Sequence, residues 1–241
     1  MNLLLVLTAH FLGDFVFQTE SMAQKKRTCI KCFILHCLIY SLFISLTLIW
    51  IRPIDKIIFA LIIIVLSHIT IDFIKNIVLK MISKRYEDHK RFDFTVFVFD
   101  QIIHILIILF IVGLTETKSI YTGIKDINPV AVIAFIYILC LSPSAVFIKK
   151  VLMLFSMQKE DESDNTLSKS GYIIGILERI IILTLGLSGQ IGAIGFVLAA
   201  KSLARFKQLE DRIFAEKYLI GTLLSTTIAL LCVILGRFLL N

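Results

Sequence analysis

Continuous apolar runs restrict the fold of this chain more than any other feature of its sequence. A helix needs roughly 20 residues to cross the hydrocarbon core of a bilayer, and several runs approach or exceed that length. They lack the polar–apolar alternation of membrane β-barrel strands. Apolar residues make up 58% of the chain, against about 45–50% in soluble domains. We therefore predict an all-α, polytopic transmembrane helix bundle. Its eight expected hydrophobic segments are residues 2–20, 29–51, 56–79, 93–114, 129–151, 171–187, 189–204 and 214–239.

The stretch 171–204 has two interpretations. Its segments are short, and Gly186, Gly189, Gly192 and Gly195 recur between and within them at every third position. Small residues permit either close helix approach or a break in a span. The stretch therefore forms two spans or a re-entrant hairpin, and the hairpin would leave seven or six crossings.

Lys and Arg are distributed unequally between the expected loops. Most of the 25 lie after the first, third and fifth segments or before the last, and Lys26 and Lys75 are counted among them. Short loops rich in Lys and Arg face the cytoplasm, so both termini are expected outside. Anionic lipid at the inner leaflet accounts for the net charge of +7, and we expect membrane lipid, not nucleic acid, as the partner.

One clearly polar stretch, residues 156–170, interrupts the apolar runs and carries four acidic residues. We predict a cytosolic linker there, between a five-helix membrane unit at 1–155 and a C-terminal membrane unit at 171–241. The sequence contains no P-loop, dinucleotide fingerprint or nucleophile elbow.

Four histidines fall within expected spans, one in each of the first four segments. Three of them stand four residues from an aspartate and the fourth stands four from a tyrosine, which places each pair on one helix face. In the first and third segments His precedes Asp, and in the oppositely directed fourth segment Asp precedes His. All three aspartates should thus lie one turn, about 5.4 Å, nearer the cytoplasm than their histidines. The pairs are His10/Asp14, His36/Tyr40, His68/Asp72 and Asp100/His104.

Ionisable groups inside a span are costly and mark functional sites. Imidazole and carboxylate suit Zn, Fe or Mn. The expected ligands of one or two such divalent ions are His10, Asp14, His68, Asp72, Asp100 and His104, and in a one-metal site the aspartates could instead orient the imidazoles. Catalytic roles are expected for His36, Asp14 and Asp100, with His36 or an aspartate that does not bind metal as general base, and Gln18 and Tyr40 are expected nearby as substrate-binding residues.

Three function classes use this cluster differently. An intramembrane metal-dependent hydrolase would activate a metal-bound water against a lipid, a lipid-linked phosphate or a peptide bond. A transporter or channel would pass protons or a divalent cation through the same groups. A non-catalytic membrane sensor or assembly factor would use them as a structural polar network between helices. Whether the protein is an enzyme is left open by the sequence.

The C-terminal segments carry further polar residues. Glu178 and Arg179 lie within segment six and form either an internal ion pair or part of a substrate site. Lys201 and Arg205 are positioned as cytosolic anchors, or as ligands of a phosphate or lipid head group.

Two of the five cysteines form a CxxC motif, Cys29 and Cys32, at the entrance of the second segment. Such a pair is redox-active or metal-binding, or it consists simply of small residues at a membrane helix end. The remaining cysteines lie inside apolar runs and do not indicate a disulfide framework.

Several stretches resemble a bacterial membrane-protein family known as domain of unknown function 3307. The resemblance implies a location in the bacterial cytoplasmic (inner) membrane and implies no activity. The matching stretches are residues 10–18 (HFLGDFVFQ), 67–72 (SHITID), 100–104 (DQIIH), 199–206 (AAKSLARF) and 216–225 (EKYLIGTLLS).

Overall fold

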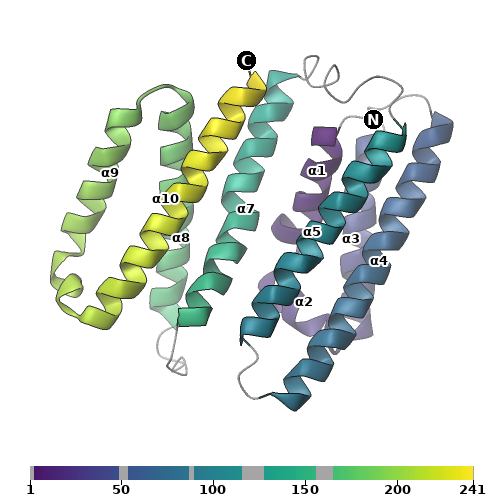
Figure 1. Cartoon of the computed structure of the whole chain (residues 1–241), viewed down its shortest axis with the longest axis horizontal. Helices are drawn as coiled ribbons and strands as arrows, with labels where there is room; N and C mark the ends of the chain where they lie inside the picture. Colours follow the sequence, from purple (N-terminus) through teal and green to yellow (C-terminus); the bar gives the residue numbers. More distant parts are fainter. Residues whose placement is uncertain (1–2, 49–53, 87–89, 116–127, 156–164, 241) are drawn as a thin grey trace. The chain divides into compact units, whose positions relative to one another are not determined.

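A computed structural model describes residues 3–48, 54–86, 90–115, 128–155 and 165–240 (Figure 1). The described residues form helices joined by turns and contain no strand. The chain divides into two compact units, Met1–Ala131 and Val132–Asn241. The predicted all-α, polytopic class is confirmed, because six helices of the described part are long and apolar enough to cross a membrane. Two shorter apolar helices, Leu3–Val16 and Ile191–Ala204, account for the other expected segments.

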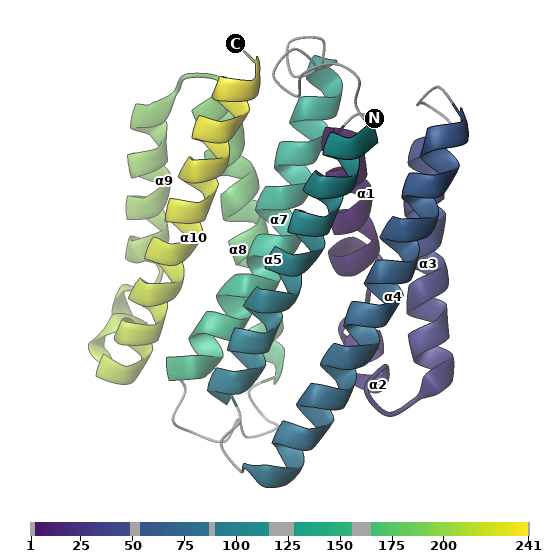
Figure 2. The ribbon, with the colours of Figure 1, turned by 45° about the vertical axis from the view of Figure 1, so that its right-hand side comes forward.

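The first unit is a ring of four packed helices. Helix α1 packs against α3, α3 against α4, α4 against α5, and α5 back against α1. Figure 2 shows α3 and α4 running side by side. Each of the four contributes one face to a shared interior. The elements are α1 (Leu3–Phe11), the π-helix η1 (Leu12–Val16), α2 (Glu20–Lys25), α3 (Ile30–Leu48), α4 (Ile54–Arg85) and α5 (Lys90–Thr115).

A π-helical turn follows α1 directly. The N–H of Phe17 donates to the carbonyl of Leu12 at 2.9 Å, the i→i+5 pattern that defines this rare helix and that is frequent at functional sites. Gly13 lies in this turn, and a Cβ there would stand 3.1 Å from the Cα of Tyr40. Glycine at this position therefore allows the turn that carries Asp14 to lie directly against α3.

In the first unit, polar side chains lie in the interior and many large apolar side chains lie on the outside, which is the reverse of a soluble protein. The side chains of His10, His36, His68 and Asp72 are fully buried, whereas Phe110 and Leu114 on α5 are among the most exposed. Large apolar side chains on the outside are compatible with hydrocarbon as the surrounding medium. An apolar core from α1, α3, α4 and α5 includes Tyr40 and lies next to the histidines.

The second unit contains α7 (Pro129–Phe155), α8 (Asn165–Leu187), α9 (Ile191–Ala204), the 3₁₀ helix η3 (Phe206–Glu210) and α10 (Arg212–Leu240). Helix α8 packs against both α9 and α10. The turn from α8 to α9 passes through Gly189, whose φ of +82° favours a residue without a Cβ. Helix α9 has 14 residues, fewer than the roughly 20 needed to cross a bilayer.

Helix α7 packs in a different unit from the one that the sequence analysis expected. The sequence analysis places residues 129–151 in an N-terminal unit that ends at 155, whereas α7 joins the second unit. The hydroxyl of Tyr137 hydrogen-bonds that of Thr184 on α8 at 2.7 Å, and Ile136 lies against Gly236 of α10. Most of the predicted polar linker, residues 156–164, lies outside the described residues.

Close packing of α8 on α10 depends on Gly186, the glycine of the three-residue series with the least space for a side chain. An added Cβ would stand 2.3 Å from Cγ2 of Val233, whereas at Gly192 and Gly195 it would meet nothing within 4 Å. We expect Gly186→Ala to destabilise the second unit by about 1–2 kcal/mol through overpacking. Gly192→Ala should have little effect, and Val233→Ala should relieve part of the Gly186→Ala defect. Denaturant unfolding of the three single variants and of the Gly186→Ala/Val233→Ala double variant measures these stability changes. Equal stabilities of Gly186→Ala and Gly192→Ala contradict the expectation.

Candidate functional site

The expected histidine layer is present inside the first unit. The ring centroids of His68 and His104 are 4.6 Å apart, those of His10 and His104 are 5.5 Å apart, and those of His10 and His68 are 6.3 Å apart. These residues come from α4, α5 and α1. The closed ring of helices brings them together because each histidine lies on the inward face of its own helix.

Four atoms that could bind a metal, two imidazole nitrogens and two carboxylate oxygens, lie close together beside this layer. Nε2 of His36 lies 3.2 Å from Nε2 of His68, 3.4 Å from Oδ1 of Asp14 and 3.1 Å from Oδ2 of Asp72. Nε2 of His68 lies 3.5 Å from Oδ1 of Asp14. His36 is thus at the centre of the cluster. Two overlapping triads, His10/Asp14/His68 and His36/His68/Asp72, present ligand atoms close enough to share a metal ion.

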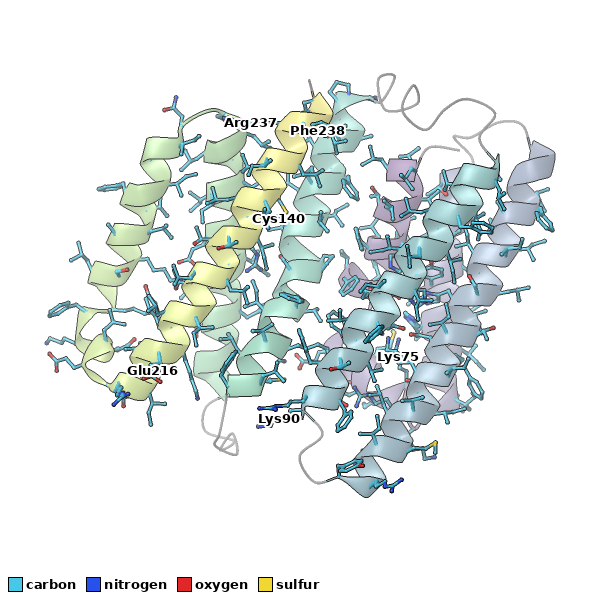
Figure 3. The ribbon with its side chains drawn as sticks, in the orientation of Figure 1. Lys75, Lys90, Cys140, Glu216, Arg237 and Phe238 are labelled. Atoms are coloured by element: carbon cyan, nitrogen blue, oxygen red, sulfur yellow. The ribbon has the colours of Figure 1, made fainter. Side chains whose placement is uncertain are left out.

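Two lysines enter the carboxylate layer, which the sequence analysis did not anticipate. Nζ of Lys26 lies 2.5 Å from Oδ2 of Asp72, and both side chains are buried. Nζ of Lys75, a residue labelled in Figure 3, bridges Oδ1 of Asp72 at 3.0 Å and Oδ2 of Asp100 at 2.6 Å. The sequence analysis counted both lysines among the loop cations. The i,i+3 spacing of Lys75 from Asp72 could have indicated its role, whereas nothing local to Lys26 indicates that it reaches α4.

Two glutamines connect the layers. The amide nitrogen of Gln101 donates to Oδ2 of Asp14 at 3.4 Å and of Asp100 at 3.1 Å, while its oxygen accepts from Nε2 of His10 at 3.4 Å. Gln18, with its amide oxygen toward Lys26, accepts from that Nζ and donates to the Asp14 carbonyl, both at 2.8 Å. Gln18 therefore contacts the cluster, its substrate-binding role stays a prediction, and Gln101 adds a residue that the sequence analysis missed.

Tyr40 supports two histidines. Its hydroxyl lies 3.3 Å from Nδ1 of His10, and with Nε2 of His10 donating to Gln101 this Nδ1 accepts the hydroxyl proton. The Tyr40 ring stacks on His68, with centroids 3.5 Å apart and planes 5° apart. Tyr40 thus orients imidazoles on α1 and α4 at once.

Asp100 and His104 lie beside the four close atoms of Asp14, His36, His68 and Asp72 and are not among them. Nδ1 of His104 donates to the Asp100 carbonyl at 2.7 Å, so its Nε2 carries the lone pair. Among the described residues, that Nε2 and Oδ1 of Asp14 are buried with no hydrogen-bond partner. A buried polar atom without a partner costs about 1–3 kcal/mol and is rare, so the cluster has acceptor capacity that the protein's own donors do not fill.

Residues 2–131 match the family model described as a protein of unknown function (DUF3307). The match covers more than half of the chain. The chain belongs to this family. The matched region of the DUF3307 protein coincides with the first compact unit and contains every residue of the cluster. No curated protein and no solved structure matches the chain.

The four C-terminal residues singled out from the sequence lie in the second unit of the DUF3307 protein. Glu178 pairs with Lys201, whose Nζ lies 2.6 Å from Oε2 and 3.1 Å from the hydroxyl of Thr222. Arg205 lies over the ring of Phe214 at 5.9 Å. Lys201 is therefore engaged within the protein, and Glu178 forms an ion pair with this lysine of α9, whereas the sequence analysis gave a pair with Arg179 as one of two alternatives.

Arg179 instead binds helix backbone. Its guanidinium donates to the carbonyls of Cys140 at 2.9 Å and Leu141 at 3.3 Å and to the hydroxyl of Ser225 at 3.2 Å. Pro143 lies inside α7, where proline removes one helical hydrogen bond and displaces its neighbours. Arg179 thus supplies donors to carbonyls next to this interruption, as neighbouring helices must do within a membrane.

Proposed function

We propose that this DUF3307 protein is a membrane-embedded metalloenzyme whose first unit binds one divalent ion between Asp14, His36, His68 and Asp72. The observation that carries the proposal is four distances of 3.1–3.5 Å between possible ligand atoms, three from Nε2 of His36 and one between Nε2 of His68 and Oδ1 of Asp14. Atoms that share one ion through bonds of about 2.0–2.2 Å stand roughly 3 Å or slightly more apart, and a coordination number above four would leave a position for a water. Two imidazoles and two carboxylates suit Zn, Fe or Mn.

The charges of the cluster support a cation. Three buried carboxylates, Asp14, Asp72 and Asp100, face two ammonium groups, Lys26 and Lys75. With neutral histidines one negative charge is left, and an uncompensated charge in a low-dielectric interior is costly. A divalent ion would more than offset that single charge, so the count supports a cation without fixing its valence, and the ion would fill the acceptor capacity of Asp14.

Hydrolysis is the reaction that this arrangement favours. A bound divalent ion supplies a water that ionises near neutral pH. His104 takes the role of general base that the sequence analysis gave to His36, because its Nδ1 is committed to the Asp100 carbonyl and its Nε2 is free to accept a proton. Gln101 holds the Asp14 carboxylate in place. The proposed substrate is a membrane lipid or lipid-linked phosphate in a bacterial inner membrane, reached from the cytosolic side, with both termini outside.

Metal content separates the proposed ligands from matched residues of the same cluster. We expect protein purified without chelators to hold stoichiometric Zn, Fe or Mn, and His68→Ala and Asp14→Asn to lose it. The loss in affinity should exceed about a hundredfold, since even partners that merely orient a ligand are worth 10–100-fold. His104→Ala and Asp100→Asn should retain the metal, and His104→Ala should lose hydrolysis.

The measurement is elemental analysis of the five proteins, each checked for folding by its elution as a monodisperse species. Wild-type protein that takes up none of the three metals overturns the proposal. Equal metal loss in all four variants also overturns the assignment, since it would point to general disruption of the polar network.

A second candidate rests on the direct contact of His36 with His68. Two imidazole Nε2 atoms at 3.2 Å are within reach of a shared proton, which supports a proton relay and hence a transporter or channel. Proton flux in proteoliposomes that is lost in Asp72→Asn, from protein free of metal, favours this candidate over the metalloenzyme.

A further inference from the structure

The CxxC motif lies at the start of a long helix and outside the cluster just described. Cys29 immediately precedes α3, and Cys32 is the third residue of that helix. The N–H of Cys29 donates to the Lys25 carbonyl at 2.8 Å, and its own carbonyl accepts from the N–H of Phe33 at 3.1 Å. Cys29 is therefore held in the N-cap position between α2 and α3.

The two thiols are the accessible ones among the five cysteines. Cys29 and Cys32 are half-buried, whereas Cys37, Cys140 and Cys232 are buried. The metal-capable groups among the described residues include neither Cys29 nor Cys32, and a structural zinc site needs four ligands. The arrangement thus favours reaction between the two sulfurs over metal binding.

The surroundings of Cys29 stabilise its thiolate. The backbone N–H and the thiol of Cys32 favour the charged form, and Lys31 adds positive charge, so the pKa of Cys29 is lowered. A helix N-terminus acts in the same direction. Lys25 and Lys31 are exposed on either side and attract anionic reactants. Because the thiolate is the attacking species in thiol–disulfide exchange, Cys29 is the nucleophile of the pair.

We propose that Cys29 and Cys32 form a reversible dithiol–disulfide pair that exchanges with anionic low-molecular-weight disulfides. The Cys29 thiolate attacks one sulfur of the small disulfide, whose S–S bond breaks and releases one thiolate, leaving a mixed disulfide on Cys29. The released thiolate takes the proton of the Cys32 thiol. The Cys32 sulfur then attacks the Cys29 sulfur and releases the second small thiolate, which is protonated by solvent. The protein pair is oxidised by two electrons, and the small disulfide is reduced to two thiols.

The test uses the full chain in lipid nanodiscs, equilibrated with varied ratios of reduced and oxidised glutathione. After acid quenching and alkylation, mass spectrometry reports each cysteine. We expect Cys29 and Cys32 to lose alkylation together in a single two-electron transition while Cys37 is unchanged. Cys37→Ser should keep the transition, and Cys29→Ser and Cys32→Ser should lose it.

The single variants also test which sulfur attacks. Cys32→Ser should accumulate a glutathione mixed disulfide on Cys29 at least about tenfold faster than Cys29→Ser does on Cys32. Independent oxidation of the two cysteines, or equal adduct rates in the two variants, overturns the proposal. Metal content in Cys29→Ser should equal that of wild type, so this result is separate from the proposed metalloenzyme.

Discussion

Lys75→Met should destabilise the first unit by about 3–5 kcal/mol. Its ammonium bridges Asp72 and Asp100 at 3.0 and 2.6 Å, and both carboxylates are buried. Methionine preserves much of the side-chain volume and removes the charge. The effect therefore isolates the cost of leaving two buried carboxylates with less compensation, which exceeds the net contribution of the ion pairs themselves.

Two comparisons sharpen this expectation. Lys80 lies on the same helix and is exposed, so Lys80→Met should change stability by no more than about 0.5 kcal/mol. Adding Asp100→Asn to Lys75→Met should recover part of the loss, because it removes one uncompensated charge. Maleimide labelling of the buried Cys37 during a denaturant titration reports the unfolding of the first unit. Equal stabilities of Lys75→Met and Lys80→Met contradict the assigned role of Lys75.

Arg179→Met should destabilise the second unit by about 3 kcal/mol or more, because hydrogen bonds that involve a charged group contribute about 1.5–3 kcal/mol each. The substitution removes donors from the carbonyls of Cys140 and Leu141 and from the hydroxyl of Ser225. Inside a membrane no bulk water replaces them. Labelling of Cys140 (Figure 3) and Cys232, both buried, follows the unfolding of this unit.

Pro143 provides the test of mechanism for Arg179. Pro143→Ala returns to α7 the N–H that bonds the Leu139 carbonyl and removes the ring that displaces the adjoining turn, so the neighbouring carbonyls of Cys140 and Leu141 should depend less on the guanidinium. The loss caused by Arg179→Met should shrink by about 1 kcal/mol in that background. Arg212→Met, which removes an exposed ion pair with Glu216, should be nearly neutral. Strictly additive effects of the Arg179 and Pro143 substitutions would show that the two residues act independently.

The fold class and the histidine layer follow from the sequence by local rules. Whether a segment is apolar enough for a membrane depends on its own residues, and side chains four apart share a face of any helix. Together with alternating helix direction, these rules predict His10, His68 and His104 at one depth, and in the structure their rings lie close together.

Only the tertiary structure decided which polar groups meet. Lys26 reaches Asp72 from 46 positions away, and Gln101 joins Asp14 on η1 to Asp100 beside it on α5. The central position of His36 and the membership of α7 in the second unit depend likewise on which helices pack together. Hydropathy and spacing are properties of one helix at a time, whereas these contacts depend on the rotation and neighbours of several helices, which no single segment encodes.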